Sequence, residues 1–505
     1  MVIKVLSATT IGLDIHKISV EVDVTNSLPQ IAIVGLGDTA ISEAKERLKL
    51  AIKNSGYSFP STKVVINLAP ANLKKEGAIY DLAMAVGILT KEKIINSIDD
   101  DIAFLGELSL DGSIRPVNGV LPIVSGAYGL GIKKVIVPID NLAEASFASD
   151  IEIYGAKNLV EVVEYLNGNY ELKQLKQNVD DFLDVSYETS VDFKDIKGQS
   201  QAKIALEIAA AGAHNILMSG TPGSGKTMLA RAFSSILPPL NPQEAIELTK
   251  IYSIAGLIDN KFPLIVKRPF RSPHHSASSV GITGGGSNPK PGEITLAHRG
   301  VLFLDEMPEF PRNVLEVLRQ PLEENFVTIS RAQNTIQYPA NFILIGAMNP
   351  CPCGFLGDKK KACTCSDFQI NRYKSKLSGP LLDRIDIQIN VPRLTDEELL
   401  SIKQDSETSA DIRRRVIKAR NIQLERYKDE NIYTNSELTP KLINKYCKID
   451  DSSKTILKGA INKFNLSARA YDRILKISRT IADIKGEQNI KMEHIMQALT
   501  FRGLV

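Results

Sequence analysis

The chain has 505 residues, too many for one hydrophobic core, so we expect roughly three domains. Its 43% hydrophobic and 24% charged residues are ordinary for globular protein, and a net charge of +3 neither requires nor excludes a nucleic-acid partner. No apolar stretch approaches the roughly 18–20 residues that cross a bilayer, and no signal sequence opens the chain, so we expect a cytoplasmic protein without membrane contact.

The first block, residues 1–168, alternates short β-rich runs with helical stretches. Residues 31–34, 63–67 and 133–137 predict strands, and residues 40–55 predict a helix. This alternation indicates an α/β or α+β domain.

Three runs in the first block carry a resemblance: PANLKKEGAIYDLAMA at 70–85, GELSLDG at 106–112 and KKVIVP at 133–138. They resemble the proteolytic domain of Lon, whose α+β fold is shared with the RadA repair protein. Lon proteases need a serine nucleophile and a lysine base, and this chain has Ile79 and Leu121 at those positions. Since neither side chain can attack a carbonyl or accept a proton, we expect no protease activity and a role in oligomerisation or in binding a partner.

Four lysines of the first block are candidates for contacts with nucleic-acid phosphates. They are Lys74, Lys75, Lys133 and Lys134. The alternative, and the more common case, is that they lie on a solvated face.

The rest of the chain divides into a linker and two further blocks. Residues 169–190 are polar and charged, which is typical of a linker. Strands and helices alternate over residues 191–392, which predicts a mainly parallel sheet with helices on both faces. Residues 393–505 show a helical pattern with little β signal.

The strongest motif is GTPGSGKT at residues 220–227, which matches the phosphate-loop spacing G-x-x-x-x-G-K-[ST]. It lies between an expected strand at 215–218 and an expected helix at 228–233. Glycines let the backbone N–H groups turn around a β-phosphate, the lysine reaches the β- and γ-phosphates, and the threonine hydroxyl holds Mg²⁺. The expected nucleotide-binding residues are Gly220, Thr221, Pro222, Gly223, Ser224, Gly225, Lys226 and Thr227.

A second motif follows the apolar run VLFL at 301–304, which ends in Asp305 and Glu306. Asp305 can coordinate Mg²⁺ through its water shell, and Glu306 can orient and deprotonate the water that attacks the γ-phosphate. A core strand ending in solvated acids is the alternative. Downstream of a phosphate loop, the catalytic interpretation is favoured.

With both motifs present, residues from about 190 to 505 resemble the AAA+ ATPases, a resemblance that implies ATP and Mg²⁺ as cofactors. The run FKDIKGQ at 193–199 resembles the segment that lines the adenine pocket, with Ile196 and Gln199 as the expected contacts. Asn349, after the expected strand 342–347, resembles the sensor that helps to position the attacking water.

Two arginines are implied by the same resemblance. Arg384, in SGPLLDRID at 378–386, matches an arginine finger, and Arg469 matches the second sensor, which contacts the γ-phosphate of its own subunit. A planar guanidinium suits the charge that develops on phosphoryl oxygens. A local ion pair of Arg384 with Asp383 or Asp386 is the alternative. An arginine finger that acts on a neighbour implies a homo-oligomeric ring, most commonly a hexamer.

Two inserted segments narrow the resemblance. RPFRSPHHSAS at 268–278 is followed by a flexible glycine-rich stretch at 284–287, and residues 326–338 predict a β-hairpin. The hairpin tip carries Arg331, Gln333 and Asn334. Both segments resemble the pore-facing insertions of the magnesium-chelatase and replicative-helicase branch. Together with MNPCPCG at 348–354, these sequence motifs are similar to those of the chelatase-like family called ComM or YifB.

His274 and His275 suggest a metal or catalytic role. Adjacent side chains of an extended chain point to different sides, so a structural or loop-positioning role is the favoured alternative.

Four of the five cysteines form two C-x-C pairs, Cys351 with Cys353 and Cys363 with Cys365. Four thiolates so close together suit tetrahedral Zn²⁺, although the common spacing is C-x₂-C. Structural zinc and reduced, unliganded thiols both stay open. Cys447 is expected to be a small core residue.

Three functions compete. The family resemblance implies a ring that moves on single-stranded or branched DNA, as a helicase or branch-migration factor in natural transformation or recombination. A chelatase-type motor subunit is the second candidate, although no D-x-S-x-S metal-adhesion motif is present and the Lon-like block is foreign to that enzyme. A protein-remodelling ATPase is the third.

Overall fold

The protein is described by a computed structural model that covers residues 2–36, 38–75, 77–183, 191–286, 289–330, 335–358, 360–395, 407–464 and 467–502. The chain divides into two units. Unit 1 holds residues 1–184 together with 241–266, and unit 2 holds residues 185–240 together with 267–505.

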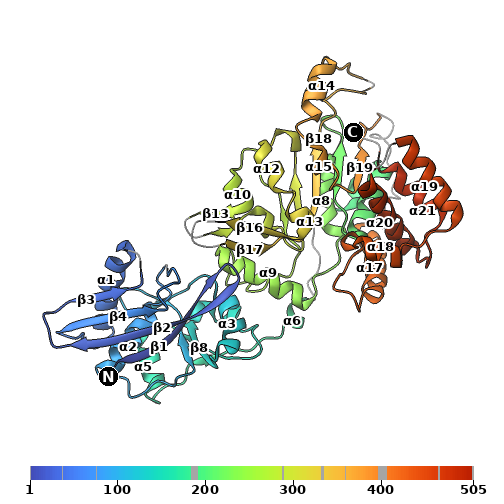
Figure 1. Cartoon of the computed structure of the whole chain (residues 1–505). Coiled ribbons are helices and arrows are strands. Elements are labelled where there is room, and N and C mark those ends of the chain that lie inside the picture. The colour runs from blue at the N-terminus through green and yellow to red at the C-terminus, as the bar shows by residue number, and fades with distance from the viewer. Residues whose placement is uncertain are drawn as a thin grey trace. The chain divides into compact units, whose positions relative to one another are not determined.

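Unit 1 is built on a mixed, eight-stranded sheet of order β10-β9-β8-β5-β1-β2-β4-β3 (Figure 1). The long strands β1 and β2 pair antiparallel, with Ile3 opposite Val22, whereas β1, β5, β8 and β9 run parallel. The strands are β1 Ile3–Ile11, β2 Asp14–Thr25, β3 Ile31–Val34, β4 Lys63–Ala69, β5 Ile102–Phe104, β8 Lys134–Pro138, β9 Glu152–Ala156 and β10 Lys173–Gln174, with a separate pair β6 Glu107–Leu108 and β7 Ile114–Arg115.

Helices pack on this sheet and complete the α+β fold. Helix α2, Asp81–Lys91, contacts β1 and β2, and its residues from Asp81 to Leu89 are buried. The other helices of the unit are α1 Asp38–Asn54, α3 Val120–Ala127, α4 Leu142–Ala145, α5 Leu159–Leu166, α6 Asp180–Leu183 and α9 Pro242–Ala255.

Two features of unit 1 come from segments that the sequence pattern assigns elsewhere. Strand β10 lies within the 169–190 segment expected to be a linker, and it pairs with β9. Helix α9 lies within the 191–392 block, yet it packs against α3, and the N–H of Gly119 donates to the carbonyl of Ser253 at 3.2 Å. Tertiary contacts, which a linear pattern does not contain, decide both placements.

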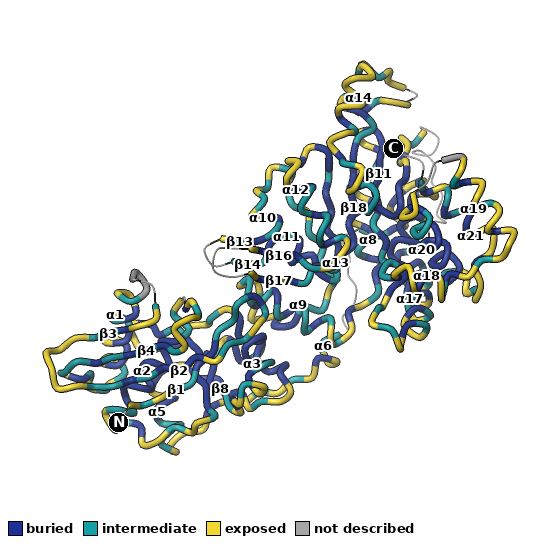
Figure 2. Tube along the Cα trace, viewed as in Figure 1, coloured by how far each residue is buried: buried dark blue, intermediate teal, exposed yellow. Residues whose placement is uncertain are grey.

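Unit 2 is centred on five parallel strands in the order β12-β15-β18-β11-β19. All four residues of β11, all four of β15 and all six of β18 are buried, as expected for apolar strands covered on both faces (Figure 2). The strands are β11 Ile216–Ser219, β12 Phe270–Arg271, β15 Val301–Leu304, β18 Ile343–Met348 and β19 Ile387–Asn390.

The helices that accompany this sheet before residue 395 are short, apart from α7. They are α7 Ser200–Gly212, α8 Lys226–Phe233, α10 Ser279–Thr283, α11 Glu293–Leu296, α12 Arg312–Val317, α13 Pro321–Glu324, α14 Asp367–Lys374 and α15 Gly379–Leu382.

The C-terminal region is helical, as predicted. Helix α20 contacts α21, α17 and α7. Figure 1 shows α17, α20 and α21, in orange and red, next to the edge of the sheet formed by β19. The helices are α17 Ser409–Arg426, α18 Pro440–Tyr446, α19 Asp451–Phe464, α20 Ala468–Lys485 and α21 Met492–Thr500. The predicted fold class, α/β with a parallel-sheet core and a helical C-terminal region, is therefore confirmed.

The hairpin insertion and the glycine-rich stretch after the first insertion each form a short antiparallel pair. Strands β16 Phe326–Ser330 and β17 Thr335–Pro339 make the predicted hairpin, whose tip residues Arg331, Gln333 and Asn334 lie outside the described residues. The glycine-rich stretch was expected to be flexible, but β13 Gly284–Gly285 pairs with β14 Lys290–Pro291. A Cβ on Gly284 would lie 2.4 Å from the carbonyl oxygen of Lys290, so glycine here permits a close approach of two strands.

In the part of the chain that is described, no helix has both the length and the apolar character needed to span a membrane.

Candidate nucleotide-binding site

The phosphate loop lies where β11 ends and α8 begins. Because the five strands are parallel, their carboxyl ends meet at one edge of the sheet, and the loop shares this edge with the segments after β15 and β18. Gly223 and Gly225 have φ of 77° and 92°, the left-handed conformation that the turn requires. A Cβ on Gly220 would lie 2.2 Å from the carbonyl oxygen of Val391, so the loop also passes close to the end of β19.

Lys226 is the buried cation of this edge, with 8% of the residue exposed. Its ammonium donates to the carbonyl oxygens of Gly220 at 2.7 Å and Thr221 at 3.0 Å, and it lies 3.4 Å from the amide oxygen of Asn349. Burial lowers the pKa of the Lys226 ammonium. The expected phosphate-binding lysine and the expected sensor asparagine are thus brought together.

Thr227 and Asp305 provide the oxygen atoms that a magnesium ion prefers. The Thr227 hydroxyl donates to Asp305 at 2.8 Å, and the other carboxylate oxygen of Asp305 accepts the backbone N–H of Glu306 at 3.0 Å. Glu306 has φ of 49°, an uncommon conformation for a residue with a Cβ. This strain is of the kind found where a side chain is held for function.

The histidine pair lies against this carboxylate. His275 Nδ1 is 3.7 Å from a carboxylate oxygen of Glu306, and its ring meets that of Phe310 edge-on. The His274 ring stacks at 4.1 Å on that of His275, and its Nδ1 lies 2.8 Å from the hydroxyl of Ser276. Neither histidine belongs to the clusters with metal-ligand spacing found in the described part of the chain. The geometry therefore agrees with the loop-positioning alternative.

The two residues expected near adenine lie in different surroundings. Ile196 is 4% exposed and belongs to the hydrophobic core of unit 2. The Gln199 side-chain amide donates to the carbonyls of Ser224 at 3.2 Å and Pro392 at 2.7 Å. Gln199 therefore contacts the phosphate loop itself and ties it to the end of β19.

Arg384 lies at the opposite edge of the sheet. The phosphate loop follows β11, whereas Asn215 precedes it, and the side-chain amide of Asn215 donates to the carbonyl of Arg384 at 3.2 Å. The Arg384 guanidinium donates to the carbonyl of Pro380 at 2.8 Å and to the carboxylate of Glu323. This arginine therefore points away from the phosphate loop of its own chain.

Arg469 shares the same partner, which corrects the expected placement. Its guanidinium is 3.6 Å from Glu323, so the structure places it beside Arg384 and not at the phosphate loop of its own subunit. The packing of α20 against the rest of unit 2, and not the sequence around Arg469, decides this position. The sequence does not single out Glu323, because an acid at the end of a short helix carries no motif.

The two arginines open onto a cavity of about 520 Å³ at this edge. Its lining includes Glu323, Arg384, Asp386, Arg469, Arg473 and Lys476. Burial by itself raises the pKa of the Asp386 carboxyl, but His214, whose Nδ1 lies 3.6 Å away, and the charge of Arg473 hold it well below its usual range. The alternative ion pair of Arg384 with Asp386 is not formed, because Arg473 lies 3.4 Å from that carboxylate instead.

Comparisons with known proteins assign the chain to a family. It is 44% identical over 506 residues to the competence protein ComM of Haemophilus influenzae, which covers 99% of this chain and 97% of that one. It is 41% identical over 498 residues to YifB of Salmonella typhimurium, with 98% and 96% covered. The chain belongs to the ComM/YifB family. Family profiles described as magnesium chelatase, subunit ChlI, and its C-terminal region match residues 192–399 and 406–502 of this ComM/YifB protein.

The chain has two further likenesses. Residues 20–141 match a family described as subunit ChlI of Mg-chelatase, so the expectation that this block is foreign to chelatase subunits is wrong. Lon protease 2 of Bacillus subtilis is 32% identical over 130 residues, covering 26% of this chain and 23% of the protease.

Ile79 and Leu121, which are expected at the positions of the Lon nucleophile and base, belong to the packed part of unit 1. Leu121 is completely buried, and its backbone N–H donates to the carboxylate of Glu144 at 3.0 Å. Ile79 is partly buried against the core of unit 1. Both side chains contribute to packing.

Lys75 was expected on the surface, either as a phosphate contact or on a solvated face, and both expectations are wrong. It is 2% exposed, its ammonium donates to the carbonyl of Pro70, and burial lowers its pKa. Lys133 and Lys134 pair with Asp101 at 3.2 Å and Asp99 at 3.4 Å.

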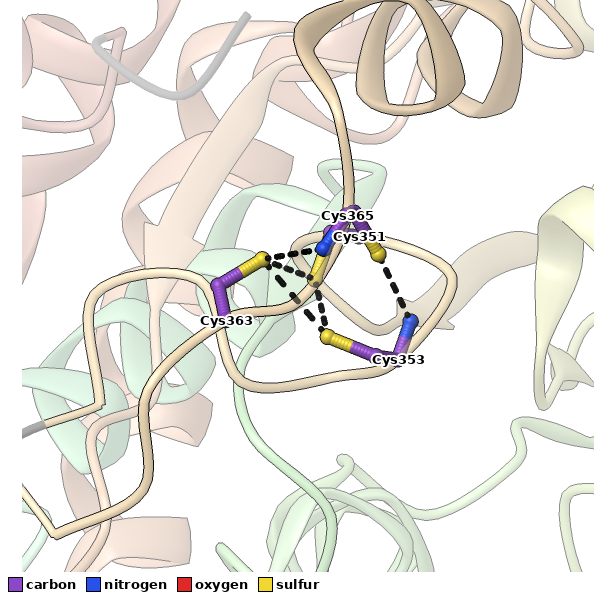
Figure 3. Close-up of side chains that lie close together, drawn as sticks. All are labelled: Cys351, Cys353, Cys363 and Cys365. Atoms are coloured by element: carbon purple, nitrogen blue, oxygen red, sulfur yellow. Dashed lines mark hydrogen bonds between the residues drawn. The ribbon is translucent and has the colours of Figure 1, made fainter.

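The five cysteines lie in two different surroundings. Cys447 is 4% exposed at the end of α18, which confirms it as a core residue, and burial raises the pKa of its thiol to about 12. The side chains of Cys351, Cys353, Cys363 and Cys365 gather in the loop between β18 and α14 (Figure 3).

Proposed function

We propose that this ComM/YifB protein is a subunit of a ring-forming ATPase motor that acts on DNA. Its action is that of a helicase or branch-migration factor in natural transformation or recombination, and it takes place in the cytoplasm. One observation carries the proposal: the phosphate loop and the two arginines lie on opposite edges of one parallel sheet. Such a chain holds two halves of a hydrolytic site that only a neighbouring copy completes.

In the proposed reaction, ATP and Mg²⁺ bind at the edge formed by β11, β15 and β18. Lys226 neutralises the phosphates, while Thr227 and Asp305 hold the metal ion. Glu306 orients and deprotonates the attacking water, and Asn349, within 3.4 Å of Lys226, fixes the position of that water. Zinc at the four cysteines is the proposed structural ion.

The charge that develops on the γ-phosphate is stabilised from the next subunit. Arg384 and Arg469 share Glu323 in the isolated chain, and a phosphate of the neighbouring site replaces that carboxylate as their anionic partner. A closed ring, with six subunits as in the AAA+ resemblance, satisfies every site.

The family relationship supports DNA as the polymer that is moved. The Haemophilus relative, similar over the whole chain, is named as a competence protein. The insertions at 268–278 and 326–338 resemble pore-facing segments, and the first of them reaches Glu306 through His275. Contact of the insertion with a polymer can therefore be communicated to the site of hydrolysis.

The ATPase rate, measured with and without forked DNA at low salt, tests the proposal. DNA should raise the rate several-fold, and the stimulation should fall as salt screens phosphate contacts. Lys226→Ala should abolish ATP hydrolysis both with and without DNA. A ring that hydrolyses ATP but neither binds DNA nor responds to it at low salt would overturn the proposal.

A chelatase-type motor is the second candidate, because three family descriptions name magnesium chelatase. It predicts ATPase stimulation by a metal-binding partner subunit and a tetrapyrrole, with no response to DNA. A Glu306→Gln chain that retains a protein and no nucleic acid would favour a protein-remodelling function instead.

A further inference from the structure

The loop between β18 and α14 has the donor geometry of a tetrahedral metal site. The sulfur of Cys351 lies 3.4 Å from that of Cys353 and 3.6 Å from that of Cys363, and Cys353 and Cys363 are also 3.6 Å apart. All four sulfurs lie within 4.8 Å of one another (Figure 3). Zinc–sulfur bonds of about 2.3 Å place the corners of a tetrahedron about 3.8 Å apart, close to these separations.

The backbone around the thiols favours negatively charged sulfur. The N–H of Cys353 donates to the sulfur of Cys365 at 3.3 Å, and the N–H of Cys365 donates to that of Cys363 at 3.4 Å. The cluster consists of sulfur donors alone, which suit zinc and not the hard cations Mg²⁺ and Ca²⁺.

This loop rests directly on the phosphate loop. The N–H of Gly354 closes a turn onto the carbonyl of Cys351 at 3.0 Å, and Gly354 has φ of +83°. A Cβ at this position would lie 2.8 Å from two ring carbons of Pro222 and 3.8 Å from the side chain of Asn349. The turn that carries two of the thiols therefore fits against the nucleotide site without space for a methyl group.

The other end of the loop returns to the same place. Helix α14 begins two residues after Cys365, and Figure 2 shows it as mostly exposed. Its buried residue Tyr373, 6% exposed, accepts a hydrogen bond from the backbone N–H of Asn349. Both ends of this segment, at Asn349 and at Tyr373, therefore lie at the nucleotide site, and the four clustered thiols lie between them.

We infer that zinc held by the four cysteines keeps Pro222 and Asn349 in place, so that ATP affinity depends on the metal. This inference rests on the proposed nucleotide site and adds the metal as a condition for it. Removing the ion frees the turn at Gly354, and the phosphate loop then loses the support of one side.

Metal content and cobalt spectra test the first half. Purified, reduced protein should contain one zinc ion per chain, and Co²⁺ in its place should give thiolate charge-transfer and tetrahedral d–d bands. The double variant Cys363→Ser, Cys365→Ser should lose both signals, whereas Cys447→Ala should keep them. Protein without zinc, and without these bands when Co²⁺ is added, would overturn the inference.

Binding of a fluorescent ATP analogue, without DNA, tests the second half. Gly354→Ala should weaken binding about tenfold or more while the zinc content is unchanged, because its methyl group meets Pro222. Gly357→Ala is the matched control: its φ is +79°, yet nothing lies within 4 Å of its Cβ, so affinity should stay as in the wild type. The double cysteine variant should also bind the analogue more weakly.

The outcomes separate this inference from the proposed function. Unchanged affinity in zinc-loaded Gly354→Ala, or in the metal-free cysteine variant, would overturn the inference and leave the motor proposal standing. A zinc-loaded wild type that binds no nucleotide would overturn both.

Discussion

The Thr227 hydroxyl donates a hydrogen bond of 2.8 Å to the carboxylate of Asp305, although 78 residues separate them in the sequence. Thr227 lies at the start of α8, after the loop that follows β11, and Asp305 directly follows β15 in the same parallel sheet. A divalent cation that binds ATP here must take both oxygens as ligands, directly or through water.

Asp305→Asn should therefore raise the Mg²⁺ concentration needed for half-maximal ATP hydrolysis by about tenfold, because an amide oxygen is a weaker ligand than a carboxylate. The measurement is a Mg²⁺ titration of the ATPase rate. Glu309→Gln is the control, since Glu309 pairs with Lys376 at 3.0 Å and is not placed at the metal site. If Asp305→Asn needs the same Mg²⁺ concentration as the wild type, Asp305 is not a ligand of the metal ion.

The two arginines should act on the neighbouring subunit. Arg384→Ala and Arg469→Ala should each lower the ATPase rate by about 10²-fold or more while nucleotide affinity stays near that of the wild type. Mixing Arg384→Ala chains with Lys226→Ala chains should restore part of the rate, because a mixed ring contains interfaces with an intact loop on one side and an intact arginine on the other.

Arg414→Ala is the control for these variants, since Arg414 is exposed on α17 and pairs with Asp411 of the same helix. If mixing restores no activity and each variant loses nucleotide affinity instead, the arginines serve their own chain.

His275 should position Glu306. His275→Ala should lower kcat for ATP hydrolysis about tenfold with little change in nucleotide affinity, because the carboxylate loses the contact at 3.7 Å. His274→Ala is the matched control: its ring nitrogen bonds the hydroxyl of Ser276 and not Glu306. Equal losses in both variants would point to a general disturbance of this loop.

Asp386 should stabilise unit 2 in a pH-dependent way. Asp386→Asn should lower the free energy of unfolding by about 3 kcal/mol at pH 7, because it removes a buried charge facing Arg473 and His214. The folded-state pKa of Asp386 is depressed, so its contribution is complete above the unfolded pKa of about 4 and is lost as pH falls towards the folded value.

Thermal unfolding of the wild type and of Asp386→Asn between pH 7 and pH 3 measures the difference in their free energies of unfolding. This difference should become smaller below about pH 4. A difference that is constant over the whole range would show that the effect comes from packing and not from the charge.

The parts of the site that the sequence predicts are local. Eight consecutive residues specify the phosphate loop, and an apolar run followed by two acids specifies Asp305 and Glu306. Since each motif lies at the end of a strand, the parallel sheet brings the motifs together. The rule that parallel strands end at the same edge of a sheet is enough to predict that Lys226 and Asn349 lie close together.

The parts that the sequence does not predict depend on how elements pack. The expected position of Arg469 at its own phosphate loop was wrong because the docking of α20 places it beside Glu323. The side chain of Lys75 is buried although its neighbours are charged, and α9 packs with α3 although it follows the phosphate helix. None of these placements leaves a periodic or motif signal in the chain.

Under the proposed function, ATP hydrolysis in a ring moves DNA, and the migration of a Holliday junction measures this movement directly. The wild-type protein with ATP and Mg²⁺ should convert a mobile junction into its duplex products, and Glu306→Gln should bind the junction without moving it. A wild-type ring that hydrolyses ATP and binds the junction, yet leaves it unmoved at every nucleotide concentration, would contradict the proposed motor function.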